Sequence, residues 1–139
     1  MTGSRSRTLK VGLSGAVLFF VAGMARADDT HGFLNRVHKD AEGNEYKYVV
    51  FVPHADKVDK PRPVIMFLHG AGERGNDGEL QAKVGLGPAI QKREKDFPFV
   101  AVFPQCQPGK TWQAESPDSQ RAMAILGEVE KEFRSDPDR

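Results

Sequence analysis

Two short apolar runs constrain the fold of this chain more than any other feature. They are 64–68 (VIMFL) and 99–103 (FVAVF), and a proline precedes each of them. Unbroken apolar runs of this length are typical of strands that are buried on both faces, as in parallel sheets covered by helices. We therefore predict two buried strands of one sheet.

The rest of the chain adds a strand and two helices. A β-branched and aromatic segment, 46–53, predicts another strand, and 88–95 predicts a short helix. An amphipathic helix is expected at 116–133, with Ser116 as the N-cap and Pro117 in the first turn. Its apolar face consists of Ala122, Ile125, Leu126, Val129 and Phe133. Strands alternating with helices predict an α/β fold with a mostly parallel sheet and flanking helices.

The N-terminal part of the chain reads as two non-domain segments. Residues 1–27 have a basic start, an apolar stretch and an Ala-Arg-Ala site, which together indicate a secretory signal peptide cleaved after Ala27. The apolar stretch is shorter than the about 20 residues of a membrane span, although a retained signal anchor is the alternative. Residues 28–45 are mostly polar and are expected to be a lead-in segment, followed by the domain at 46–139. A secreted or periplasmic location follows from this interpretation.

Charge and cysteine content exclude several classes of function. The net charge is +1, but residues 1–27 carry four of the 20 basic residues and no acidic one, so the remainder has a net charge of −3. A mildly acidic body without a basic stripe argues against binding to nucleic acid. The single cysteine, Cys106, allows no intrachain disulfide and is expected to be a partly buried small hydrophobe rather than a reactive thiol. No residues have metal-ligand spacing, so we predict no metal and no cofactor.

A glycine-rich loop, His69-Gly70-Ala71-Gly72, directly follows the first apolar run. Ligands of open α/β sheets bind where the strands end, and glycines let the backbone approach a ligand closely. Backbone N–H groups of Ala71 or Gly72 would stabilise the negative charge that develops in acyl transfer, as an oxyanion hole does. In this interpretation His69 has a structural role within the loop.

Two other interpretations of the loop remain open. Gly70, Gly72 and Gly75 formally satisfy the dinucleotide-binding spacing G-x-G-x-x-G, but glycines and Asn76 keep the following segment irregular instead of helical. The strand at 99–103 also offers no acidic residue for a ribose. The second alternative is that the loop is a glycine-rich turn that binds no ligand.

Four sequence elements taken together resemble a known family. VIMFLHGAGERGND, FVAVFPQC, Trp112 and the final helix ending in DPDR are similar to the α/β-hydrolase superfamily, in its phospholipase/carboxylesterase and predicted-peptidase branch. Feruloyl esterases and polyhydroxybutyrate depolymerases are relatives of that branch. The resemblance implies ester hydrolysis by a serine on a G-x-S-x-G elbow, an acid and a histidine.

The resemblance places that elbow strand just beyond 135–139, so we expect this chain to stop short of the nucleophile. The segment 12–16 (GLSGA) is a near miss inside the signal peptide, and Ser116 and Ser119 are better explained as helix caps. The four histidines, His31, His38, His54 and His69, all precede the position expected for the base. The chain is therefore expected to be inactive alone.

The resemblance also implies roles for residues near the loop. Glu73 and Arg74 are expected to hold the loop or to line the substrate site, with a solvated exposed pair as the alternative. Trp112 is expected near the acyl pocket, with packing against the helix at 116–133 as the alternative.

The resulting hypothesis is the N-terminal portion of a secreted serine hydrolase. Its substrates would be small or polymeric carboxylic esters, with peptides as a further class. A non-catalytic secreted binding module is a different class of function, and a truncated gene product that does not fold alone is a third hypothesis.

Overall fold

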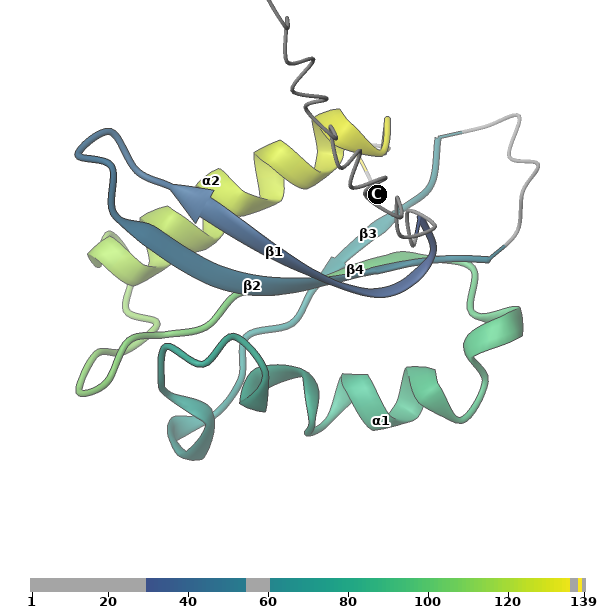
Figure 1. Ribbon diagram of the computed structural model, residues 1–139, viewed down its shortest axis with the longest axis horizontal. Coiled ribbons are helices and arrows are strands. Elements are labelled where there is room, and N and C mark those ends of the chain that lie inside the picture. Colours follow the sequence, from purple (N-terminus) through teal and green to yellow (C-terminus); the bar gives the residue numbers. More distant parts are fainter. Residues whose placement is uncertain (1–29, 55–60, 136–137, 139) are drawn as a thin grey trace, which may run out of the picture.

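The computed structural model describes residues 30–54, 61–135 and 138. One sheet lies between two layers of helices (Figure 1). The strands are β1 (Gly32–Lys39), β2 (Glu45–Val52), β3 (Val64–Met66) and β4 (Val100–Phe103). The helices are α1 (Leu86–Gln91) and α2 (Pro117–Glu132), with single-turn 3-10 helices η1 (Ala71–Glu73), η2 (Leu80–Ala82) and η3 (Glu94–Asp96).

The sheet is mixed, with the strand order β1-β2-β4-β3. β3 and β4 pair in parallel, and α1 lies in the connection between them. β1 pairs with β2, and β2 with β4, in the antiparallel direction. The partial α/β fold with flanking helices is confirmed, but the expectation of a mostly parallel sheet is corrected, because a tight hairpin forces β1 and β2 to run in opposite directions.

β1 lies inside the segment 28–45, where we expected no strand. Its inward positions are occupied by Gly32, Leu34 and His38, which are buried, so the segment has no apolar alternation that would predict a strand. The hairpin turn is closed by Asp40, whose carbonyl accepts from Gly43 N–H at 3.0 Å. Gly43 has a φ of +85°, a conformation that glycine adopts without steric cost.

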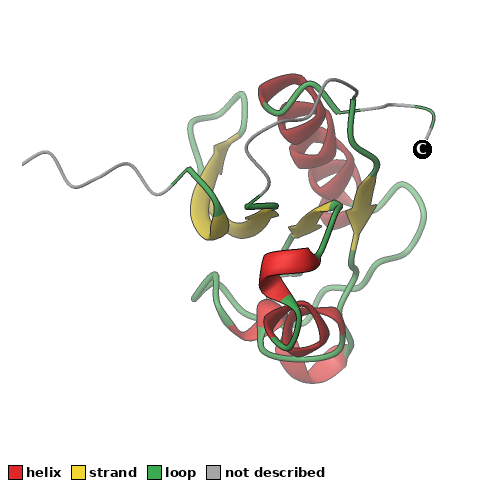
Figure 2. Cartoon of the chain, turned by 90° about the vertical axis from the view of Figure 1, so that its right-hand side faces the viewer, coloured by secondary structure: helices red, strands yellow, loops and turns green. Residues whose placement is uncertain are grey.

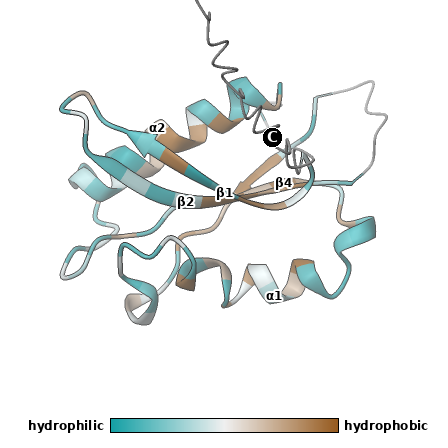
Figure 3. Cartoon of the chain, in the orientation of Figure 1, coloured by the Kyte–Doolittle hydropathy of each residue, from teal (hydrophilic) through white to brown (hydrophobic). Residues whose placement is uncertain are grey.

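Both faces of the sheet are covered. Helices lie on both sides of the strands (Figure 2). Period-2 alternation along β2 and β4 divides the buried side chains into two clusters. The cluster under α2 consists of Leu34, Tyr48, Val50, Val52, Val100, Val102, Ile125 and Val129. The cluster above α1 and η2 consists of Val49, Phe51, Ala82, Ile90, Ala101 and Phe103. The strands are accordingly most apolar between the helix layers, whereas the hairpin tip is hydrophilic (Figure 3).

The helix predicted at 116–133 is confirmed as α2. Ser116 is its N-cap, with the hydroxyl oxygen accepting from Ser119 N–H at 3.2 Å, and Pro117 stands in the first turn. The predicted apolar face packs on the sheet. Ala122, Ile125 and Val129 are buried, and Leu126 and Phe133 pack against the same cluster.

In the part of the chain that the structure describes, no helix is long and apolar enough to span a bilayer. The predicted signal peptide at 1–27 lies outside the described residues.

Candidate functional site

The loop predicted as the site leaves the carboxyl end of β3 and turns into η1. Gly70 stands before η1 with extended backbone, at φ −81° and ψ −171°. His69 is buried at 3% exposure, whereas Gly70, Ala71 and Gly72 are exposed. The structure therefore places a buried histidine beneath an exposed stretch of backbone.

His69 is held by both of its ring nitrogens. Nε2 accepts the backbone N–H of Cys106 at 2.9 Å, and a backbone N–H can only donate. The ring proton therefore sits on Nδ1, which lies 2.7 Å from the carbonyl oxygen of Gly70 and donates to it. His69 is a neutral structural residue in this arrangement, and neither nitrogen is available to take a proton from a nucleophile.

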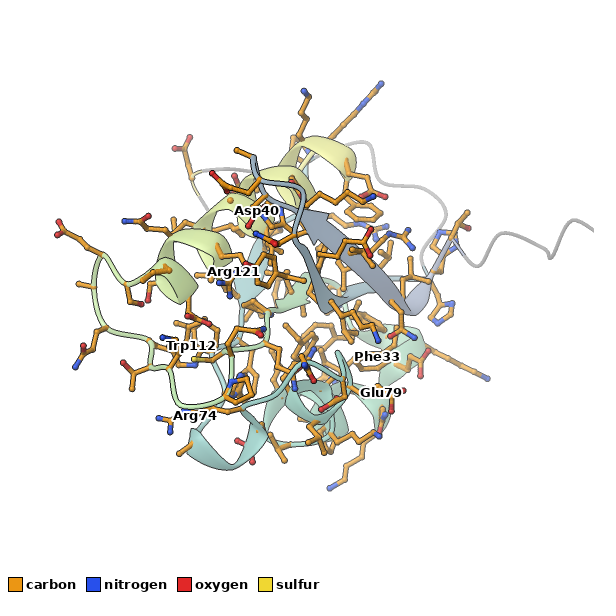
Figure 4. The ribbon with its side chains drawn as sticks, turned by 60° about the vertical axis from the view of Figure 1, so that its left-hand side comes forward. Phe33, Asp40, Arg74, Glu79, Trp112 and Arg121 are labelled. Carbon is orange, nitrogen blue, oxygen red and sulfur yellow. The ribbon has the colours of Figure 1, made fainter. Side chains whose placement is uncertain are left out.

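Trp112 lies directly on the loop. Its indole N–H donates to the carbonyl oxygen of His69 at 2.9 Å, and the two rings meet edge to face with centroids 5.2 Å apart. Figure 4 shows Trp112 on the same side of the molecule as Arg74 of the loop. Trp112 was expected either near the acyl pocket or packed against the helix at 116–133. The contacts observed here are with His69 of the loop.

Two backbone N–H groups at the start of η1 are without hydrogen-bond partners among the described residues. A 3-10 helix bonds each N–H to the carbonyl three residues back, so the first bond of η1 starts at Glu73. The N–H groups of Ala71 and Gly72 precede it and have no partner within the helix. A Cβ atom added at Gly72 would meet no atom within 4 Å, so the space next to these groups is open. These two N–H groups can therefore donate to an acceptor from outside the loop.

Glu73 and Arg74 are half-buried, and the structure describes no ion pair between them. The carbonyl oxygen of Glu73 accepts from the side chain of Gln105 at 3.1 Å. The Glu73 carboxylate lies beside Gly70, where an added Cβ would come within 3.3 Å of Oε2. Glu73 is thus anchored through its backbone.

The segment after β4 was not expected to hold the loop. Cys106 receives Gly75 N–H on its carbonyl oxygen at 2.9 Å, in addition to donating its own N–H to His69. Asp118 of α2, 2% exposed, in turn accepts the N–H of Gln107 at 2.8 Å. Because parallel strands end at the same edge of a sheet, the residues after β3 and β4 had to be neighbours. This rule could have predicted, from the sequence alone, that the segment after β4 contacts the loop.

Cys106 is buried, more fully than the sequence led us to expect. Burial raises the pKa of its thiol, and the nearby carboxylate of Asp118 raises it further. The thiolate is therefore disfavoured, and the side chain is a packing group rather than a nucleophile.

Serines and histidines are not combined into a catalytic pair within the described ranges. Ser116 bonds to Ser119 and to the carbonyl of Thr111, which is capping chemistry. His38 pairs with Glu128 at 2.9 Å, and His54 pairs with Glu94 at 2.9 Å. The described residues also contain no group of three or more His, Cys, Asp or Glu side chains that could hold a metal ion.

The α-helix that a dinucleotide-binding site requires directly after the glycine loop is not present at that position among the described residues. That fingerprint places an α-helix N-terminus at the glycine loop, on the pyrophosphate. Here Gly70, Gly72 and Gly75 are followed by bends and η2, and α1 begins only at Leu86.

A solved structure resembles this chain. It is described as a thermostable esterase, superposes with a TM-score of 0.64 and is 30% identical. The likeness is to an esterase. It covers 75% of this chain and 31% of the esterase, so the chain spans about a third of that protein's length. No protein-family model and no curated protein matches the chain. The likeness supports an esterase-like α/β-hydrolase fold, and the phospholipase/carboxylesterase branch stays a prediction.

Proposed function

We propose that this chain is the N-terminal portion of a secreted serine hydrolase that acts on carboxylic esters, and that His69–Gly72 supply its oxyanion-hole loop. The observation that carries the proposal is the pair of unpartnered N–H groups at Ala71 and Gly72, on a braced loop at the carboxyl end of β3. The 30% identity to a thermostable esterase supports the same reaction class.

The chemistry of the loop is electrostatic. Attack on an ester carbonyl leaves a negative oxygen, and fixed backbone N–H groups stabilise it without reorganising. His69 holds the loop through the bonds to Gly70 and Cys106, and Trp112 bonds to the carbonyl of His69. In this proposal Trp112, Glu73 and Arg74 border the substrate space. The serine, the acid and the base are supplied, in this proposal, by sequence that follows Arg139. Polyesters and peptides are further substrate classes of the same branch.

The first test reads the coding DNA beyond the Arg139 codon and then assays the longer product. We expect a strand followed by G-x-S-x-G, and hydrolysis of p-nitrophenyl butyrate that a serine-directed phosphonate blocks. A stop codon at that point, or unrelated sequence beyond it, contradicts the proposal.

The decisive variant in the longer product is Ala71→Pro, which deletes one of the two N–H groups. Proline fits the first position of a helix, and Gly70 already has the extended backbone that a residue before proline requires. We expect kcat to fall about 100-fold to 1,000-fold with KM little changed, as for loss of one oxyanion donor.

The control is Gly127→Ala, which adds a methyl group to open space on the exposed side of α2 and lies outside the loop. It should hydrolyse the ester within about twofold of the parent, since no contact opposes the added group. Equal kcat values for Ala71→Pro and Gly127→Ala would remove the oxyanion-hole assignment.

A further inference from the structure

The buried side chain of Gln105 reaches the candidate loop from the segment after β4. It is 4% exposed, and its amide makes three hydrogen bonds. Oε1 accepts Gly78 N–H at 2.8 Å, while Nε2 donates to the carbonyl oxygen of Glu73 at 3.1 Å and to Asp77 Oδ2 at 3.2 Å. The partners are a group that only donates and two that only accept, so the orientation of the amide is fixed.

These bonds fix the end of η1 that His69 does not reach. His69 ties the start of the loop to Cys106, and Gln105 ties the carbonyl of Glu73, the last residue of η1. The unpartnered N–H groups of Ala71 and Gly72 lie in the chain between these two fixed points. Their direction is therefore set from both sides.

The backbone also packs tightly on the Gln105 amide. A Cβ atom added at Gly75 would lie 2.9 Å from Nε2 of Gln105, closer than real Cβ contacts, and 3.0 Å from Oδ2 of Asp77, which is tighter than most of them. Gly75 therefore allows the loop to close on Gln105, and a larger residue would push the two apart.

We propose that Gln105 is a positioning residue that holds the oxyanion-hole loop in its working geometry. The inference rests on the proposed function of the loop, and Gln105 itself touches no substrate. An apolar side chain would fill the same volume but leave Gly78 N–H and the Glu73 carbonyl unpaired. A buried amide is the group that supplies one acceptor and two donors together.

The test is Gln105→Glu, which keeps the shape but removes both donors and sets a negative charge against the Glu73 carbonyl and the Asp77 carboxylate. The first readout is amide hydrogen exchange at Gly75 and Gly78, by NMR, on the full chain at pH 7. We expect exchange about tenfold to 100-fold faster, because loss of the bonds from Nε2 to Glu73 and Asp77 lets the segment open more often, although the introduced carboxylate still accepts Gly78 N–H. Gln91→Glu is the matched control, because Gln91 is exposed at the end of α1 and should leave these rates unchanged.

The second readout is ester hydrolysis by the longer product. Gln105→Glu should lower kcat with little change in KM. Relative to the parent, the loss should be smaller near pH 5 than at pH 8, because protonation of the introduced carboxyl removes its charge and restores one donor. A residue needed only for folding would lower activity only in proportion to the folded fraction, so kcat is expressed per folded molecule at each pH.

The outcomes separate the two proposals. Unchanged exchange at Gly75 and Gly78 overturns the role of Gln105, whatever the activity. Faster exchange with an unchanged kcat, in an enzyme that Ala71→Pro impairs, also overturns it and leaves the proposed function intact. An unchanged kcat in Ala71→Pro refutes the oxyanion hole, while the exchange rates still decide whether Gln105 holds the loop.

Discussion

Single buried polar residues in this fold are held in one protonation state or orientation by their partners. His69 is a neutral ring because its Nε2 faces a backbone donor, and Gln105 has one amide orientation for the same reason. Tyr48 shows a different effect. It is 3% exposed in the cluster under α2, where burial first, and then the carboxylates of Glu128 and Glu132, raise the pKa of its phenol to about 12.

Tyr48 should make the fold sensitive to alkali. The unfolded phenol releases its proton near pH 10.0, below the folded value, so the unfolded state binds fewer protons and stability falls as the pH rises above 10. We expect the parent to lose about 1 kcal/mol more unfolding free energy than Tyr48→Phe between pH 9 and pH 11, measured with urea. Parallel losses in the two proteins would show that this phenol ionises alike in both states.

At the scale of elements, α2 is joined to the loop segment by a buried carboxylate. Asp118 Oδ1 accepts from Gln107 N–H at 2.8 Å and from Arg121 Nη1 at 3.0 Å. The Arg121 guanidinium also lies 3.7 Å from the centre of the Tyr46 ring, so the β1–β2 hairpin joins the same network. The first turn of α2 thus connects the hairpin to the segment that carries Gln105.

Removing that carboxylate should destabilise the whole fold. Asp118→Ala leaves Arg121 without its ion-pair partner and Gln107 N–H without an acceptor, at a cost of about 3 kcal/mol. Asp118→Asn retains an acceptor for Gln107 and should cost less. Urea unfolding curves compare the stabilities of the two variants. Equal stability of Asp118→Ala and the parent would contradict the proposed role of Asp118 in joining α2 to the loop segment.

Elements were predictable from the sequence where local chemistry defines them. The Ser116-Pro117 cap and the apolar runs place α2, β2 and β4 within a few residues. β1 was missed because its inward residues include Gly32 and His38, so it becomes a strand only by pairing with β2. The candidate loop was located from its glycines, but Gln105 and Asp118 are distant in sequence and are identified only by the folded contacts.

At the scale of the whole molecule, the described residues form a sheet whose edges are β1 and β3. One edge is the hairpin, and the other is a three-residue strand directly before the candidate loop. The similar esterase is about three times as long as the part that this chain covers. The proposed catalytic unit is accordingly larger than the sheet described here.

The proposed secretion predicts a mature protein that starts at Asp28. Mass spectrometry of the exported product in the native host should show loss of residues 1–27 from the 15.4 kDa chain. Ala27→Leu should block processing, because the residue before the cleavage site must be small. Ala16→Leu, within the apolar stretch, is the control that should still be cleaved. An exported protein of full mass would contradict the cleavage site.

The two backbone bonds of Cys106 have a consequence for the length of the loop. His69 is attached to its N–H and Gly75 to its carbonyl oxygen, so the loop begins and ends on one residue. Because both ends of the segment 69–75 bond to Cys106, the number of residues between them is fixed. One inserted or deleted residue within 69–75 would release one of the two attachments. A redesign of this loop must therefore keep the number of its residues.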